Sequence, residues 1–235
     1  GTPISKRIDV PGADLKGVLW GVDYLRTATS DSPINLNGHV IVIGGGGVAT
    51  DTAMTALRSG ADSVEIISLE QRHELPAMPA EIEDAEEEGI VFTCGWGPQK
   101  FSGEGRKVQR AEFIRCNKVF DDQGRFAPEF AISATIEREC DWVILAVGQN
   151  SDGSVFGPES GTVLKNRGFL PPESESVETW LPGFFGAGDL VHGPSSVVEA
   201  IASGKRAAAS IDEFLGGDGE FGVHTFDDQP FDGLD

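Results

Sequence analysis

Four consecutive glycines, Gly44 to Gly47, separate a run of branched apolar residues from an alanine-rich segment. A backbone without side chains can turn tightly and direct several amide N–H groups at one anion, which makes this segment a candidate phosphate-binding loop. Gly44, Gly46 and Ala49 occupy the three small-residue positions of the pattern GxGxxG/A. In a dinucleotide site the first residue permits the turn, the second admits the pyrophosphate and the third allows close packing of helix on strand.

The flanking residues predict the elements that must position this loop. Residues 40–43 are a continuous apolar run of the kind found in buried parallel strands. Residues 48–58 are rich in helix formers, and Gly60 stands where a helix C-cap glycine is expected. Residues 64–69 form a second apolar run. Strand, glycine turn, helix and strand within about thirty residues is the context that dinucleotide-binding loops require.

Glu70 lies at the end of the second predicted strand, about 24 positions after Gly46. A carboxylate there can accept hydrogen bonds from the adenosine ribose hydroxyls, and it repels a 2′-phosphate. Arg72 could instead turn toward a 2′-phosphate. We therefore expect NAD(H) to be preferred over NADP(H). The alternative is a glycine-rich turn without a ligand, and the matching strands, helix and acidic residue favour nucleotide binding.

The composition narrows the classes of function. The chain has 235 residues, of which 39% are hydrophobic, enough for a packed core in one large or two small domains. Its formal charge of −20 disfavours nucleic acids and anionic membrane surfaces and leaves another protein as the expected macromolecular partner. No segment has the roughly 20 apolar residues that span a bilayer, and the opening string GTPISKRIDVPG lacks the apolar core of a signal peptide. We expect no membrane insertion and a cytoplasmic location.

Three cysteines, Cys94, Cys116 and Cys140, are widely spaced, and none belongs to a CxxC pair. This spacing excludes a thioredoxin-like redox disulfide and a four-cysteine zinc or iron–sulfur site. We expect all three to be ordinary buried cysteines. The histidines are equally scattered and predict no metal site; they are His39, His73, His192 and His224.

Beyond the second strand, the string PAEIEDAEEEGI predicts a short acidic helix that ends at Gly89. Alternating apolar and polar residues within 107–139, interrupted by the turn DDQGR, predict a hairpin or small antiparallel meander. Residues 142–147 predict a buried strand that ends at Gly148, at the carboxyl edge of the sheet. Residues 37–150 therefore form one α/β domain in this interpretation.

The last third of the chain has a different character. Residues 151–182 are rich in Gly, Pro and Ser and predict an irregular connection. Residues 184–188 predict a short strand, which a polar loop follows. A long amphipathic helix is expected to begin at Ser195 or Ser196, as its N-cap, and to continue to about Leu215.

These segments together resemble one family, the glutamate synthase small-subunit-like NAD(P)H:acceptor oxidoreductases, which are flavoproteins of the pyridine nucleotide-disulfide oxidoreductase superfamily. The matching strings are SKRIDVPGADLKGVLWGVDYLR, VIVIGGGGVATDTA, EIEDAEEEGIVF, VILAVGQ and GFFGAGDLVHGPSSVVEAIASGKRAA, which span residues 1 to about 215. The resemblance implies an α/β fold in which a Rossmann-like NAD(P)-binding domain, with a parallel sheet and a small antiparallel meander, is inserted into a partial FAD-binding domain.

This resemblance divides the chain into four segments. The NAD(P) domain would be residues 37–150, and the FAD domain would be residues 1–36 together with residues 151–215. Residues 216–235 would be an acidic tail, interpreted as an ordinary tail rather than as a docking motif. The aromatic residues of a docking motif would be Phe221, Phe226 and Phe231.

By the same resemblance, Asp189 accepts hydrogen bonds from the flavin ribityl chain. The helix that begins near Ser196 directs its N-terminal dipole at the N1/C2 carbonyl edge of the flavin. Relatives that use NADPH commonly carry paired arginines where this chain has Leu69 and Glu70, which again favours NADH. No side chain is expected to be catalytic. The expected cofactor-binding residues are Gly44, Gly46, Gly47, Val48, Ala49, Asp51, Glu70, Arg72, Gly148, Gln149, Gly188, Asp189, Ser196 and Val197.

The resemblance implies a flavin-dependent oxidoreductase that transfers hydride from NAD(P)H to FAD. Because the cysteines form no redox pair, the electrons are expected to pass to a protein partner with a flavin or iron–sulfur centre, in a larger redox complex. The chain begins at GTPISKR, so we expect the upstream segment for the FAD pyrophosphate to be missing, and the chain to be a fragment or to be completed by another subunit. A non-catalytic nucleotide-binding or assembly subunit is the main alternative. A simple dehydrogenase and a disulfide reductase account for fewer of the strings.

Overall fold

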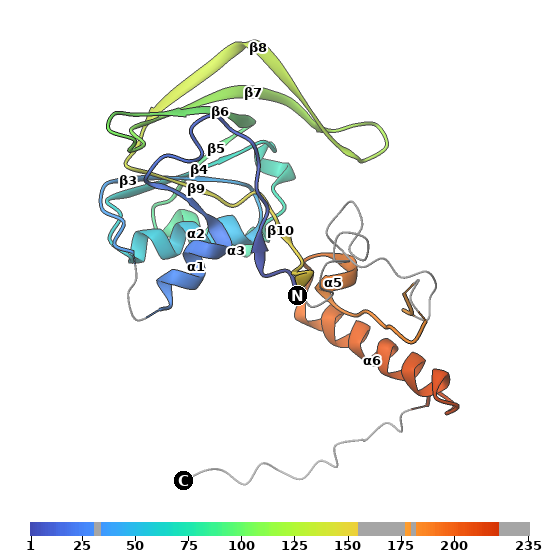
Figure 1. Ribbon diagram of the computed structural model, residues 1–235. Helices are drawn as coiled ribbons and strands as arrows, with labels where there is room; N and C mark the ends of the chain where they lie inside the picture. Colours follow the sequence, from blue (N-terminus) through green and yellow to red (C-terminus); the bar gives the residue numbers. More distant parts are fainter. Residues whose placement is uncertain (31–33, 155–176, 180–181, 221–235) are drawn as a thin grey trace. The chain divides into compact units, whose positions relative to one another are not determined.

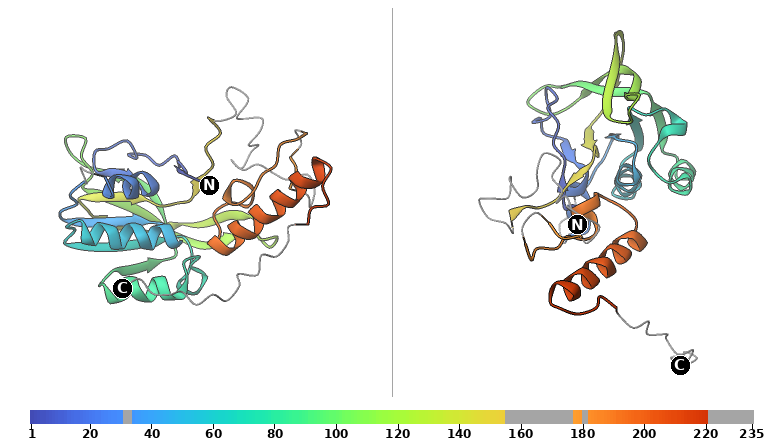
Figure 2. Two further views of the ribbon diagram at one scale, coloured as in Figure 1. Left: turned by 90° about the horizontal axis from the view of Figure 1, so that it is seen from below. Right: turned by 90° about the vertical axis from the view of Figure 1, so that its right-hand side faces the viewer.

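The computed structural model of the chain describes residues 1–30, 34–154, 177–179 and 182–220. The chain divides into two compact units (Figures 1 and 2). The sheet unit is Pro3–Asn150, and the C-terminal unit combines Gly1–Thr2 with Ser151–Asp235. Among the described residues, no helix is both long and apolar enough to cross a bilayer.

A five-stranded parallel sheet forms the centre of the sheet unit, in the order β2, β9, β3, β4, β5. Branched apolar side chains dominate the three central strands and are almost fully buried, as expected when both faces of a parallel sheet are covered. Because the strands are parallel, their carboxyl ends share one edge. The strands are β2 (Val18–Trp20), β9 (Trp142–Leu145), β3 (His39–Ile43), β4 (Ser63–Ser68) and β5 (Val91–Cys94).

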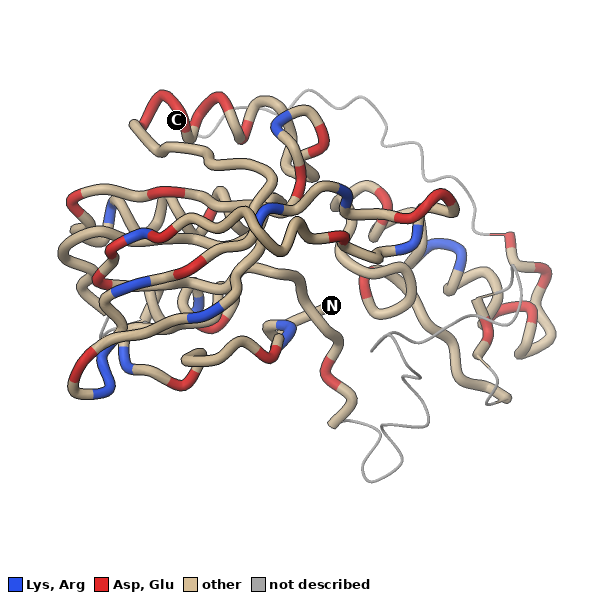
Figure 3. Tube along the Cα trace, turned by 90° about the horizontal axis from the view of Figure 1, so that it is seen from above, with Lys and Arg blue, Asp and Glu red and all other residues tan. Residues whose placement is uncertain are grey.

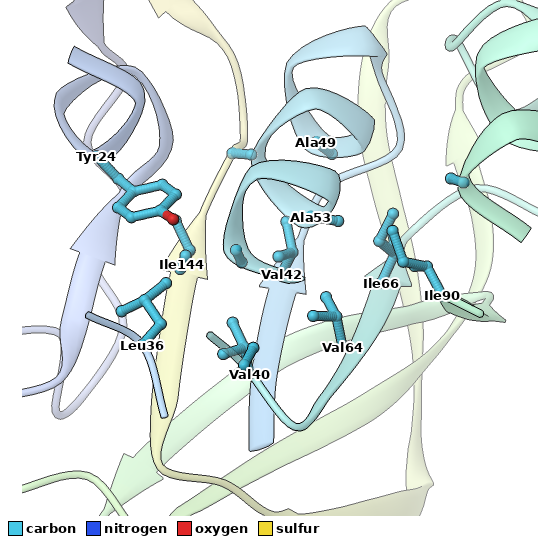
Figure 4. Packing of buried hydrophobic residues seen from close by; sticks show 14 residues of the cluster. Tyr24, Leu36, Val40, Val42, Ala49, Ala53, Val64, Ile66, Ile90 and Ile144 are labelled. Carbon is cyan, nitrogen blue, oxygen red and sulfur yellow. The ribbon is translucent and has the colours of Figure 1, made fainter. Parts of the chain in front are cut away.

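Three helices cover one face of this sheet: α1 (Gly21–Ala28), α2 (Gly47–Arg58) and α3 (Pro79–Glu87) (Figure 1). The small side chains of α2 let it approach the strands closely, and the buried ring of Tyr24 from α1 donates its hydroxyl hydrogen to Ser59 Oγ at 3.2 Å. Figure 4 shows this core, whose labelled members are Tyr24, Leu36, Val40, Val42, Ala49, Ala53, Val64, Ile66, Ile90 and Ile144.

An antiparallel meander covers the opposite face of the sheet and consists of β6 (Trp96–Ser102), β7 (Arg110–Phe120) and β8 (Phe126–Glu139). Its inner residues pack against the alternate side chains of the parallel strands, so the sheet has a core on each face. The register of β7 and β8 shifts at three places, which redirects side chains near the middle of β7. The second core includes Val10, Ile41, Ile43, Ile67, Phe101, Val108, Ala111, Phe113, Cys140, Val143 and Leu145.

The predicted boundary at residue 36 does not separate two compact units. β2 pairs with β9, α1 lies beside α2, and β1 (Ile4–Ser5) pairs with β10 (Gln149–Asn150), so residues 3–36 belong with residues 37–150. The short strand β2 completes the sheet through pairing that no local pattern reveals. In chain order, the sheet unit lies between the two parts of the C-terminal unit, as an inserted domain would. A role of residues 1–36 in flavin binding stays a prediction.

The described part of the C-terminal unit contains two helices, α5 (Asp189–His192) and α6 (Val197–Phe214). α6 begins at the expected place, and Ser196 is its N-cap. The Ser196 hydroxyl accepts a hydrogen bond from the Glu199 N–H at 3.2 Å, and the Glu199 carboxylate accepts one from the Ser196 N–H at 3.0 Å. This reciprocal capping box explains why the helix starts there.

Two expectations for this unit are wrong. Residues 184–188 form no strand, because Phe185 makes only an isolated antiparallel bridge with Glu178 and no described strand extends the pairing. The segment after Gly188 is the short helix α5 rather than a polar loop. Most of the expected irregular connection, residues 155–176, and the phenylalanines of the tail lie outside the described residues.

The α/β class predicted from the sequence is confirmed, with a parallel sheet and a separate antiparallel meander. The predicted strands and helices around the glycine loop agree with β3, α2, β4, α3 and β9 to within one or two residues. Figure 3 shows that acidic residues are spread along the whole described chain rather than gathered in one segment. Acidic residues are therefore distributed over both described units rather than confined to one of them.

Candidate functional site

The glycine loop lies at the carboxyl edge of the sheet, between β3 and its neighbour β9. Gly44 follows β3 with φ +144°, a backbone conformation that side chains disfavour. Its N–H donates to the Ile67 carbonyl at 3.0 Å, and a Cβ built on it would overlap the carbonyl oxygen of Ala146. The chain leaves β3 toward β4, whereas β9 lies on the other side, so this loop stands at the switch point where open α/β sheets bind ligands.

The N-terminus of α2 is open to a ligand. Gly46 is its N-cap, with an ordinary extended backbone (φ −95°, ψ 175°) and no side-chain cap. Among the described residues, no carbonyl or side chain accepts a hydrogen bond from the N–H groups of Gly46, Gly47 and Val48. A Cβ built on Gly46 would meet no atom within 4 Å. These open N–H donors at the positive end of a 12-residue helix fit a pyrophosphate, and a side chain at position 46 would fill the space it needs.

Ala49 accounts for the third small-residue position. It is 1% exposed, and its Cβ lies 3.5 Å from a Cβ built on Gly44. The loop therefore folds back onto the first turn of α2 without room for a larger side chain, which is the packing role expected of the third position. The structure thus brings Gly44, Gly46 and Ala49 together in the arrangement that their spacing predicts.

Two carboxylates lie against this loop, and a third lies near one of them. Glu70 Oε2 lies 2.9 Å from a Cβ built on Gly45, and burial, with the nearby Glu74, raises the pKa of the Glu70 carboxyl. Glu81 Oε2 lies 3.1 Å from a Cβ built on Gly47. Desolvation, with Glu81 beside it, raises the pKa of the Asp51 carboxyl on the first turns of α2.

Glu81 was not among the expected site residues. The acidic string of α3 predicted only a solvated face, and the position of this side chain depends on how α3 packs beside α2. These carboxylates lie beside the open N–H groups, so an anion at this loop would meet backbone donors while the surrounding charges oppose additional negative charge.

Arg72 is engaged elsewhere. Its Nη2 pairs with Glu86 Oε2 of α3 at 2.8 Å, and its guanidinium lies over the Phe92 ring at 5.2 Å from the centroid. Arg72 starts η1 (Arg72–Glu74), the short turn after β4. The alternative, in which Arg72 turns toward a 2′-phosphate, would therefore require these two contacts to break.

Gly148 and Gln149 lie at the same edge of the sheet, beyond β9. Gly148 has φ +115°, its carbonyl accepts a hydrogen bond from Lys6 N–H at 3.0 Å, and Gln149 belongs to β10. The exposed backbone of Gly148 has Lys6 as its side-chain neighbour, at 3.6 Å from a built Cβ. The structure thus places both residues at the carboxyl edge of the sheet, and their contact with a nucleotide stays a prediction.

The remaining expected residues lie in the C-terminal unit. Gly188 has φ +63°, and its N–H donates to Ser203 Oγ at 3.0 Å, which fixes the turn that leads into Asp189. Ser195 Oγ lies 3.4 Å from a carboxylate oxygen of Asp189. The capping box leaves the N–H of Val197 open, and this residue is 75% exposed. Polar acceptor atoms of a flavin fit such an open helix end.

The cysteines form no disulfide, and each is free. Cys116 and Cys140 are buried as expected, whereas Cys94 at the end of β5 is only half-buried, so the expectation for Cys94 is wrong. Cys94 ends the edge strand of the sheet, where only one side has a strand neighbour. Burial, with Asp141 beside it, raises the pKa of the Cys140 thiol to about 12.

A parallel sheet, a glycine turn at its switch point and an open helix N-terminus define the Rossmann-like class of dinucleotide-binding domains. The family model described as pyridine nucleotide-disulphide oxidoreductase matches residues 3–204. The chain belongs to this family, which confirms the resemblance drawn from its motifs.

The chain is similar to curated proteins that are named as subunits or chains of enzymes. It is 36% identical to the NADP(+)-dependent formate dehydrogenase subunit beta of Moorella thermoacetica, over 92% of this chain and 31% of that protein. It is 32% identical to the glutamate synthase [NADPH] small chain of Azospirillum brasilense, over 88% of this chain and 46% of that protein. The chain therefore spans less than half the length of these two relatives.

Solved structures support the same fold. An oxidoreductase of Mycobacterium tuberculosis, FprA, aligns with a TM-score of 0.73 and 18% identity, over 92% of this chain and 62% of that chain. At this identity the likeness shows the fold alone.

Proposed function

We propose that this chain carries the pyridine-nucleotide site of an FAD-dependent NAD(P)H oxidoreductase that passes electrons to a protein partner. Membership of the pyridine nucleotide-disulphide oxidoreductase family supports the class of reaction. The observation that carries the proposal is the open N-terminus of α2 at Gly46, because it offers N–H donors and space for a pyrophosphate at the switch point of the sheet.

The residues of the chain bind and orient rather than transfer protons. The loop at Gly44 to Gly47 holds the pyrophosphate, and the carboxyl edge beyond β9, at Gly148, receives the nicotinamide end. FAD, when bound, supplies the acceptor for a hydride from nicotinamide C4. In the C-terminal unit, Asp189 and the N-terminus of α6 hold polar atoms of the flavin. Since positioning dominates such a transfer, no side chain need act as an acid or a base.

The proposal includes a preference for NADH over NADPH. Glu70 lies at the end of β4, with its carboxylate against the glycine loop, where it accepts hydrogen bonds from the ribose hydroxyls and opposes a 2′-phosphate. The curated relatives named above carry NADP(+) or NADPH in their names. The preference of this chain therefore rests on Glu70 and not on those relatives.

The expected electron acceptor is another protein. Several relatives are named as subunits, including the NADPH-Fe(3+) oxidoreductase subunit beta of Geobacter sulfurreducens, which is 33% identical to this chain. Within this chain, Cys94, Cys116 and Cys140 are separate free thiols rather than a redox pair. We propose that reduced flavin delivers its electrons to a flavin or iron–sulfur centre of a partner subunit.

The test adds one side chain to the open loop. Gly46→Val places a bulky group where the pyrophosphate binds, yet its extended backbone and empty surroundings allow the fold to persist, with a loss of at most about 1 kcal/mol from poorer N-capping. Titration of the purified chain with NADH, followed by nicotinamide fluorescence, should show binding that Gly46→Val abolishes. Gly204→Val is the matched control, because a Cβ built on Gly204 in α6 also meets no atom within 4 Å.

A second readout separates an enzyme from a non-catalytic nucleotide-binding subunit. The chain is incubated with FAD, with and without a supplied N-terminal segment for the FAD pyrophosphate, and the absorbance of the bound flavin is followed while NADH is added under argon. Bleaching supports the oxidoreductase. NADH binding without bleaching of a bound flavin would favour the non-catalytic alternative, and no NADH binding at millimolar concentration would remove both.

A further inference from the structure

Arg115, near the middle of β7, lies at the adenosine end of the proposed nucleotide site. Two backbone hydrogen bonds hold this part of the meander against the end of β4. The Gly95 N–H donates to the Glu70 carbonyl at 2.9 Å, and the Cys116 N–H donates to the Gly95 carbonyl at 2.8 Å. These two hydrogen bonds link Glu70 to Gly95 and Gly95 to Cys116. Arg115 precedes Cys116 in β7 and therefore lies close to the end of β4.

The Arg115 side chain points back toward the residue after Glu70. A Cβ built on Gly95 would lie 2.6 Å from Gln71 Nε2 and 3.0 Å from both Cζ and Nη1 of Arg115. The guanidinium and the Gln71 amide therefore meet above Gly95, which is a glycine with φ +80°. Any side chain at position 95 would displace the guanidinium, so the glycine leaves room for it.

The guanidinium is held in place without being neutralised. It lies over the Trp96 ring at 5.3 Å from the centroid, and its Nη1 donates to the Cys94 carbonyl at 3.4 Å. No described carboxylate lies within 4.0 Å of it, although the chain has 38 acidic residues and 18 basic ones. A guanidinium has five N–H donors, and these contacts use one. Arg115 is thus a half-buried cation with N–H donors available for a ligand.

Arg115 and Glu70 act on the same small region with opposite charge. Burial is the main cause that raises the pKa of the Cys116 thiol, and Glu70 raises it further while Arg115 lowers it. The charges of Glu70 and Arg115 therefore both act on the Cys116 sulfur. Arg72, by contrast, forms an ion pair with Glu86 at the surface of α3.

We infer that Arg115 is a second specificity-determining residue, which binds the 2′-phosphate of NADPH and opposes Glu70. The inference rests on the proposed nucleotide site. A planar guanidinium with free N–H groups binds a phosphate dianion with two parallel hydrogen bonds, whereas the unphosphorylated ribose of NADH offers no charge for it. The balance of Glu70 and Arg115 sets the ratio of NADPH to NADH binding, so the chain binds both nucleotides and prefers NADH. Neither residue takes part in the hydride transfer.

The test measures the affinity of the purified chain for NADH and for NADPH by nicotinamide fluorescence at fixed ionic strength. Arg115→Gln should weaken NADPH binding about tenfold or more and leave NADH binding within about twofold. Arg115→Lys should retain a clearly larger share of NADPH binding than Arg115→Gln, because the charge remains. Glu70→Gln should strengthen NADPH binding, and Glu70→Gln with Arg115→Gln should lose most of that gain. The ratio of the two affinities does not depend on the fraction of folded protein.

Arg110→Gln is the matched control, since Arg110 begins the same strand and pairs with Glu137 at 3.4 Å, away from the carboxyl edge. It should leave the ratio unchanged. If the unaltered chain binds NADH and Arg115→Gln leaves the ratio of affinities as it was, Arg115 has only a structural role and this inference is overturned alone. If the unaltered chain binds neither nucleotide at millimolar concentration, the proposed function fails and the inference fails with it.

Discussion

The Cα of Gly44 faces the Ala146 carbonyl so closely that no side chain fits between them. Gly44 follows β3 and Ala146 follows β9, and the Ala146 N–H donates to the Ile43 carbonyl at 2.8 Å. The two neighbouring strands therefore stay together past their last paired residues, and the chain must turn sharply to enter α2. This close approach brings the open N-terminus of α2 to the switch point of the sheet, where the proposed pyrophosphate site lies.

Replacement of this glycine should destabilise the fold. Gly44→Ala adds a methyl group that overlaps the Ala146 carbonyl, at a residue with φ +144°, so we expect a loss of about 2–4 kcal/mol in the free energy of unfolding. Gly46→Ala, two residues away, adds the same group to open space and should cost at most about 1 kcal/mol. Urea denaturation followed by circular dichroism measures both. Equal losses in the two variants would contradict the different roles assigned to the two glycines.

The elements around this loop could be predicted because each has a strong local signal. The strand ending at Ile43 is a continuous apolar run, and its burial on both faces is the reason for that run. A small residue is needed at Gly44, Gly46 and Ala49 for different steric reasons. The structure shows close contacts at Gly44 and Ala49 and open space at Gly46. The cap of α6 at Ser196 was also readable, because a capping box is a local pattern.

Other elements depend on pairing that no local pattern contains. β2 has only three residues and is a strand because it pairs with β9. β6 includes Pro98 and several polar residues, and its hydrogen bonds come from β7 across a register shift. The sequence did not single out Arg115. Its neighbours depend on the pairing of β7 with β6 and β8 and on the register shift between Ile114 and Arg115. The predicted strand at 184–188 had an apolar pattern, yet no described strand pairs with it beyond one bridge.

A buried carboxylate within β4 should contribute to stability. Glu65 is 8% exposed and accepts hydrogen bonds from Thr93 Oγ1 at 2.6 Å and from Arg138 Nε at 3.2 Å. Glu65→Gln keeps the shape but leaves Arg138 without its partner charge, so we expect a loss of about 1–3 kcal/mol. Thermal and urea unfolding measure this loss.

The control for Glu65 is a more exposed pair on the meander. Glu112 lies 3.8 Å from Lys100, and its side chain is 34% exposed, against 10% for Glu65, so Glu112→Gln should change the stability by less than about 0.5 kcal/mol. A loss in Glu65→Gln no greater than that of Glu112→Gln would show that the buried pair does not stabilise the fold.

The three thiols should differ in reactivity. The Cys140 thiol is 6% exposed with a pKa of about 12, so its thiolate fraction at pH 8 is about one in ten thousand, and burial also raises the pKa of the Cys116 thiol. Half-buried Cys94 should therefore react first with N-ethylmaleimide, and mass spectrometry of peptides identifies the site. Cys94→Ala should leave the native chain almost unlabelled until denaturant is added. Labelling of Cys140 as fast as Cys94 would contradict the described burial.

Glu70 should lower the stability of the fold near neutral pH. Burial raises its pKa, so the folded state favours the protonated carboxyl, and the stabilising contribution is full below the usual glutamate pKa of about 4.5 and is lost as pH rises through the raised value. Glu70→Gln removes the desolvated charge and should raise the melting temperature at pH 7.5, with the gain shrinking to nothing toward pH 4. Melting curves measured from pH 4 to 8 test this, and Glu83→Gln on the exposed face of α3 is the control, whose difference from the unaltered chain should not grow with pH in the same way. A melting temperature that Glu70→Gln leaves unchanged at pH 7.5 would show that the carboxylate is already well solvated. A lowered one would show that contacts within the fold stabilise the carboxylate more than burial disfavours it. Either result would contradict the raised pKa of Glu70.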